Sequence, residues 1–104
     1  MEPVFSADFF RPYINTPFMI RADGVPMLEL ILLEIKEQNN AVLDEFTLIF
    51  SGPTDRIAYD NTYRLEHEVL GQFDMFLGPF FTPLKNDAVY YQAVFTHFKK
   101  GLPV

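Results

Sequence analysis

The stretch from Tyr63 to Leu77 constrains the fold more than any other, because apolar and polar residues alternate on both sides of a glycine. Alternation with a period of two is typical of a β-strand that buries one face. Gly71 is the residue at which the chain can turn with a positive φ, since glycine has no Cβ to clash. The stretch therefore predicts a β-hairpin.

The register of this hairpin follows from the rule that directly opposed residues point to the same face. A two-residue loop at Leu70-Gly71 would pair Glu68 with Phe73, which belong to opposite faces, so we predict the three-residue connection Val69-Leu70-Gly71. The predicted pairs are Glu68 with Gln72, His67 with Phe73, Leu65 with Met75, and Tyr63 with Leu77. A shift by one residue would turn every apolar side chain to solvent.

Turn signals and apolar patterns divide the rest of the chain into short elements. We predict a helix from an N-cap at Ser6 to about Tyr13, and strands at Phe18 to Ala22, Met27 to about Glu37, Phe46 to Phe50 and about Ala88 to Phe98. The turn Asp23-Gly24, the irregular connection Ser51 to Asn61, the loop Gly78 to Pro83 and a frayed tail from Lys99 to Val104 complete the chain. The expected fold is mostly β: a single domain over residues 1–104, built as a small antiparallel barrel or a two-sheet sandwich of about six strands with one short N-terminal helix.

Composition excludes several function classes. The 104 residues contain no cysteine, which rules out disulfides, a thiolate nucleophile and cysteine-based zinc sites. The net charge is −6 and the eight basic residues are scattered, which argues against nucleic-acid binding. No apolar run is long enough to span a bilayer, and no signal peptide is recognisable. We therefore expect a soluble protein without membrane contact, either cytoplasmic or part of an assembled particle.

Two carboxylates on the predicted hairpin are candidate functional groups. The predicted register places Glu66 opposite Asp74 on the outward face, with Arg64 two residues away. Opposed like charges destabilise a sheet unless a cation lies between them. The pair is therefore a solvated surface, an acidic patch that binds a partner, a cation site, or a carboxylate dyad of the kind that hydrolyses glycosides.

The remaining polar residues give little support for catalysis. His67 is predicted to face inward, where a lone histidine usually serves as a hydrogen-bonded structural residue, and His97 has no evident metal or acid partner. Ser51-Gly52-Pro53 lacks the spacing of a phosphate loop, and no nucleophile-elbow motif is present. We predict that the protein is not an enzyme and needs no cofactor.

Aromatic residues are the second candidate site. The chain has twelve Phe and five Tyr, which exceeds what a core of this size needs. Exposed apolar patches usually mark contact with another protein. The residues that the pattern places in such a patch are Phe76, Phe80, Phe81, Tyr90 and Tyr13. The alternative is that these rings plug an open end of the barrel or face a second core.

Several motifs resemble a small bacterial family of unknown function, about a hundred residues long. They are a Phe-containing helix at Phe9 to Pro12, Phe-x-Leu-x-Phe-x-Gly-Pro at Phe46 to Pro53, Tyr-x-Leu-x-His-x-x-Leu-Gly at Tyr63 to Gly71, Gly78-Pro79, and Tyr-x-Ala-Val-Phe at Tyr91 to Phe95. These motifs are typical of the family's fold, and the resemblance implies no catalytic residue. The family is often encoded beside proteins similar to phage tail collar or tail fibre proteins, which implies a structural or assembly role.

Three functions remain open from the sequence. The first is a non-enzymatic interaction module of a phage-tail-like system, which binds a protein or a second copy of itself through its aromatic surface. The second is a small acidic inhibitor or immunity-type protein that masks a basic surface through Glu66 and Asp74. The third is a small barrel that binds an apolar ligand of unknown identity.

Overall fold

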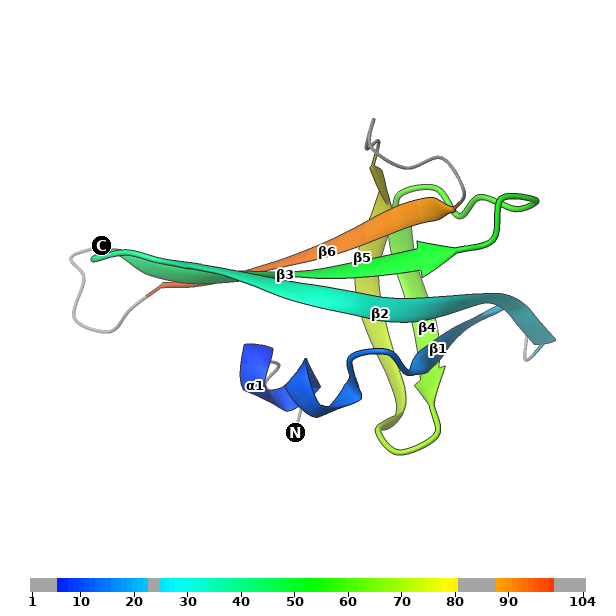
Figure 1. The fold of residues 1–104 in the computed structure, drawn as a ribbon, viewed down its shortest axis with the longest axis horizontal. Coiled ribbons are helices and arrows are strands. Elements are labelled where there is room, and N and C mark those ends of the chain that lie inside the picture. Colours follow the sequence, from blue (N-terminus) through cyan, green and yellow to red (C-terminus); the bar gives the residue numbers. More distant parts are fainter. Residues whose placement is uncertain (1–5, 23–24, 81–87, 99–104) are drawn as a thin grey trace.

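Six antiparallel strands form a closed barrel in the computed structural model, which describes residues 6–22, 25–80 and 88–98 (Figure 1). The strands are β1 (Pro17–Ala22), β2 (Val25–Asn39), β3 (Leu43–Gly52), β4 (Asn61–His67), β5 (Gly71–Phe80) and β6 (Val89–Phe98). They follow the order β1-β2-β3-β6-β5-β4 around the ring, and β1 pairs with β4 to close it. The predicted mostly-β fold is therefore confirmed, and of the two architectures considered it is the barrel.

The barrel combines two three-stranded meanders, β1-β2-β3 and β4-β5-β6. Among the described residues, the pairing of β5 with β6 joins Gly78, Pro79 and Phe80 to Gln92, Tyr91 and Tyr90. Beyond these pairs the two strands diverge. Figure 1 shows β2, β3 and β6 running on together past the barrel, above the N-terminal helix, while β4 and β5 cross behind them. The loop predicted at Gly78 to Pro83 is wrong for its first three residues, which belong to β5.

β2 is a strand, as predicted, although its apolar run lacks clean alternation. Leu28, Leu30 and Leu32 are buried in the barrel. The pairing with β3 shifts register between Leu32 and Glu34, so Leu33 is an extra residue and is 37% exposed. A β-bulge therefore explains the run, because the inserted residue adds a leucine without requiring burial on both faces.

The N-terminal segment covers the place where β5 and β6 diverge. Helix α1 (Ala7–Phe10) begins with the predicted cap, in which the Ser6 hydroxyl accepts a hydrogen bond from the Phe9 N–H at 3.1 Å. The 3₁₀ helix η1 (Arg11–Tyr13) follows, with Pro12 in its first turn. Phe10 is fully buried, and its ring contacts rings from three strands. These are Phe18 of β1, Phe73 of β5 and Phe95 of β6, at centroid distances of 6.2 to 6.5 Å.

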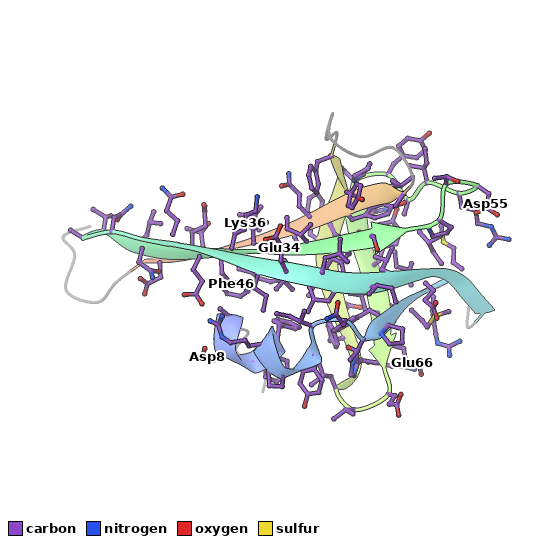
Figure 2. The ribbon with its side chains drawn as sticks, viewed as in Figure 1. Asp8, Glu34, Lys36, Phe46, Asp55 and Glu66 are labelled. Atoms are coloured by element: carbon purple, nitrogen blue, oxygen red, sulfur yellow. The ribbon has the colours of Figure 1, made fainter. Side chains whose placement is uncertain are left out.

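An ion pair ties this segment to β2. The Arg11 guanidinium bonds both Asp8 and Glu37 of β2, and these carboxylates raise the pKa of the arginine. Phe46 stacks on Phe95 with centroids 4.7 Å apart. Figure 2 shows Phe46 on the side of the sheet that faces α1 and Lys36 on the opposite side. The segment contributes Phe10 to the hydrophobic core, and Tyr13 and Ile14 pack against that core.

The irregular connection predicted over Ser51 to Asn61 is confined to residues 53–60, because Ser51 and Gly52 belong to β3 and Asn61 to β4. Three long side chains hold it. The buried Tyr91 hydroxyl accepts a hydrogen bond from the Ala58 N–H at 3.0 Å. The Tyr63 hydroxyl donates to the Tyr59 carbonyl at 2.5 Å, and Arg56 donates to the Met27 carbonyl at 2.8 Å. Burial is the main reason that the pKa of Tyr63 is raised. These bonds bring residue 60 across the outer face of β5.

The hairpin forms where the sequence predicts it, but the predicted register is wrong by two residues. The turn contains residues 68–70, and the observed pairs are His67 with Gly71, Leu65 with Phe73, and Tyr63 with Met75. A shift of two keeps every side chain on its predicted face. Gly71 has a φ of 81°, so the predicted positive φ is confirmed, although the glycine is the first residue of β5 and not the last of the loop.

The side chain of His67 accounts for the position of the turn. Its Nδ1 atom accepts hydrogen bonds from the backbone N–H groups of Val69 at 3.0 Å and Leu70 at 3.2 Å. Nδ1 is therefore unprotonated, and the Nε2–H donates to the Thr16 hydroxyl at 2.9 Å. Thr16 in turn donates to the Tyr13 carbonyl at 2.5 Å. His67 is 5% exposed and hydrogen-bonded on both nitrogens, as a structural histidine should be.

Candidate interaction surface

The outer face of β5 divides into a polar half near the hairpin turn and an aromatic half toward β6. In the polar half, Asp74 lies opposite Arg64, and Glu66 lies opposite Gln72. The predicted opposition of Glu66 and Asp74 is therefore wrong, because the turn begins one residue earlier than expected. Arg64 Nε donates to Asp74 Oδ1 at 2.7 Å, and the bond raises the pKa of the arginine.

A second arginine neutralises Glu66. Arg21 of β1 donates through Nε to Glu66 Oε1 at 2.6 Å, and the Gln72 amide donates to Glu66 Oε2 at 3.0 Å. The bonds from Gln72 and Arg21 lower the pKa of the Glu66 carboxyl. Two arginines thus balance the two carboxylates that the sequence singles out. An inhibitor function based on this acidic pair stays a prediction, and the balance of charge does not favour it.

In the aromatic half, three rings point away from the barrel interior. Phe76 is 61% exposed, and Phe80 and Tyr90 are half-buried. Phe80 is directly opposite Tyr90 in the sheet, and their ring centroids are 6.3 Å apart. We call Phe76, Phe80 and Tyr90 the aromatic face. Phe81, which the sequence also assigns to the patch, lies outside the described residues.

Asp60 lies between the two phenylalanines of this face. Gly78 points outward like Phe76 and Phe80, because residues two apart share a face. A Cβ built on Gly78 would lie 1.6 Å from the Asp60 Oδ1 atom and 3.1 Å from its Cα atom. The Asp60 side chain therefore occupies the place that a side chain at position 78 would take. Within the described residues, Asp60 is exposed and forms no hydrogen bond or ion pair through its carboxylate.

One other residue that the sequence assigns to the patch lies elsewhere. Tyr13 is half-buried and packs edge-on against His67, with ring centroids 5.0 Å apart. Its assignment to the exposed patch is wrong, because the 3₁₀ helix turns its ring onto the barrel. The side chain of His97 lies outside the described residues.

The barrel interior is occupied by the chain's own side chains. Among the described residues, the largest side chains with less than 2% of their surface exposed are Tyr91, Phe10, Phe18, Phe50, Ile20, Leu30, Leu32, Leu48, Leu65 and Leu77. An apolar ligand in the interior would have to displace some of them, so the ligand hypothesis stays a prediction. Within the described ranges, no three His, Asp or Glu side chains gather as metal ligands. In the same part of the chain, no helix is long and apolar enough to cross a membrane.

Sequence reasoning missed Asp60 as a member of the surface. The available signal was Gly78, since a glycine inside an alternating strand often marks the close approach of another backbone. The sequence shows that something must pass over Gly78, but it does not show which residue. The answer depends on a contact between distant residues. The Tyr91 hydroxyl holds the backbone at Ala58, and the chain that follows carries Asp60 over Gly78.

A comparison with models of protein families matches residues 5–95 to DUF6916, a domain of unknown function. The match includes α1, all of β1 to β5 and most of β6. No curated protein and no solved structure matches the chain.

Proposed function

We propose that this chain, which belongs to the DUF6916 family of domains of unknown function, is a non-enzymatic protein-interaction module. One observation carries the proposal: Phe76 is 61% exposed in the middle of a regular strand, on the face that also bears the Phe80–Tyr90 ring pair. An aromatic side chain gains most of its burial energy only when a partner covers it. Large aromatic residues of this kind are the usual anchors of protein interfaces.

The location of the aromatic face supports the same conclusion. The hairpin pairing and the seam between β5 and β6 hold Phe76 and Phe80 on a rigid strand. A rigid surface loses little conformational entropy when it binds, which favours affinity. The polar half of β5 beside it is charge-balanced, so it would not repel a partner of either sign.

The finer part of the proposal concerns the partner. The resemblance described above links this family to neighbours that are similar to phage tail collar or tail fibre proteins. We propose that the module is an accessory or assembly component of a phage-tail-like particle. The basis is association between neighbouring genes, and the aromatic face is the surface through which such a component would attach.

The test is complex formation between the purified chain and each of the proteins that neighbouring genes encode. Size-exclusion chromatography with light scattering measures the mass of the mixture and of each component alone. We expect a complex for the unchanged chain and at least a tenfold loss of affinity when Phe76 and Phe80 are both replaced by serine. The chain alone, run over a range of concentrations, tests whether the partner is a second copy.

A matched control separates this surface from exposed apolar residues in general. Val69 is 65% exposed in the turn at the other end of β5, so Val69→Ser removes a similar exposed group outside the aromatic face. We expect Val69→Ser to bind as the unchanged chain does. If no neighbouring protein and no second copy forms a complex, or if all variants bind equally, the proposal is wrong.

A further inference from the structure

We propose that the aromatic face receives an arginine side chain of the partner, which bonds the Asp60 carboxylate and lies against the rings of Phe76 and Phe80. This inference rests on the proposed function and names the chemistry of the residue that the partner contributes. It also specifies a charged anchor that aromatic residues alone would not require.

The arrangement of charge on β5 is the first step. Asp74, two residues from Phe76 on the same face, is neutralised by Arg64 at 2.7 Å. Asp60 differs from it, because within the part of the chain that the structure describes its carboxylate has no cationic partner. Of Asp60 and Asp74, Asp60 is thus the carboxylate available to a cation from outside. The overall charge of −6 favours the approach of such a cation.

The spacing is the second step. Residues two apart on a strand are separated by roughly 7 Å. Because the Asp60 carboxylate occupies the Cβ position of Gly78, it lies about that far from the Cβ atoms of Phe76 and Phe80. A guanidinium bonded to the carboxylate would therefore come within the distance of about 6 Å at which cations interact with aromatic rings.

The chemistry of the cation is the third step. A guanidinium is planar, can donate two parallel hydrogen bonds to one carboxylate, and stacks on aromatic rings. An ammonium group is a compact, strongly hydrated charge and gains less from flanking rings. The combination of one carboxylate with flanking phenylalanines therefore favours arginine over lysine.

The experiment titrates the ¹⁵N-labelled full chain with the peptide acetyl-Gly-Arg-Gly-amide and follows backbone amide shifts. The matched peptide contains citrulline, which has the shape of arginine without its charge. We expect arginine-dependent shifts at the amides of Asn61, Phe76, Leu77, Gly78 and Phe80. We also expect about fivefold weaker binding of the citrulline peptide. Shifts of equal size with both peptides, or no shift at these residues, would overturn the inference.

Three variants locate the effect. Asp60→Asn removes the charge and keeps the shape, and should weaken arginine binding about fivefold. Asp55→Asn makes the same change elsewhere in the connection and should have no effect (Figure 2). Gly78→Ala keeps the charge but forces the Asp60 side chain from its position, and should weaken binding as Asp60→Asn does.

The outcome is independent of the test of the proposed function. If Phe76 and Phe80 are needed for the complex but Asp60→Asn has no effect on arginine binding, the inference fails and the interaction module stands. If arginine binds but no protein complex depends on the aromatic face, the proposed function fails.

Discussion

Acidification should weaken the fold through a single side chain, His67. Burial lowers the pKa of His67 below its ordinary value of 6.5, against an opposing effect of Glu68. The unfolded chain then binds a proton more readily than the folded chain. Stability from this group is therefore complete at neutral pH and is lost as pH falls below about 6.5, with a slope of up to about 1.4 kcal/mol per pH unit.

The structure also indicates the size of the loss. A proton on Nδ1 would face the N–H groups of Val69 and Leu70, so both hydrogen bonds would break. At about 1 kcal/mol for each bond, protonation should cost the folded state about 2 kcal/mol. The hairpin turn is the part of the molecule that would lose its order first.

The assay is urea denaturation at intervals between pH 7.5 and 5.0. His97→Asn leaves His67 as the remaining histidine and should keep the slope of the unchanged chain. His67→Asn preserves an acceptor near the Nδ1 position but does not titrate, so its slope should vanish although its stability at pH 7.5 is lower. Protonation of Glu66 does not contribute to the slope between pH 7.5 and 5.0, because the pKa of this carboxyl lies below its ordinary value of 4.5. A slope that persists in His67→Asn would refute the reasoning.

Three further substitutions test the fold. Gly71→Ala should lower the free energy of unfolding in urea by about 1 kcal/mol because the φ of 81° disfavours a Cβ, and an unchanged midpoint would contradict this. Phe10→Ala should cost about 3–5 kcal/mol in the same assay, with Phe9→Ala, at the 36% exposed neighbour, as a control of much smaller effect. Asp74→Asn should barely move the thermal midpoint, since its pair with Arg64 is exposed; a loss as large as that of Phe10→Ala would be inconsistent with this account.

Local sequence patterns predicted the strands and the helix of this fold, but they did not predict the register between β4 and β5. Alternation and Gly71 predicted the hairpin and its inward face correctly. The register depended on whether the turn begins at residue 68 or 69, and His67 decides this by bonding two amides of the turn. Periodicity contains no information about such a bond, because it gives the face of a residue and not its partners.

Long-range packing explains the other differences. Phe10 had no distinguishing pattern, yet its ring lies between Phe73 of β5 and Phe95 of β6, at a place where the described parts of these strands do not pair. The alternation correctly placed Phe76 on the outer face, since that depends on strand parity alone. The position of Asp60 over Gly78 depends on a connection anchored by Tyr91, so the sequence could indicate the glycine but not the residue above it.

The most direct test of the interaction module is site-specific photo-crosslinking from position 76 in the cells that naturally produce the protein. A benzoyl-phenylalanine at Phe76 replaces one exposed ring by a reactive one, and the same residue at Val69 is the control. The account predicts one dominant product from position 76, identified by mass spectrometry as a tail-type component or a second copy of this chain, and none from position 69. Equal products from both positions, or none from position 76, would contradict it.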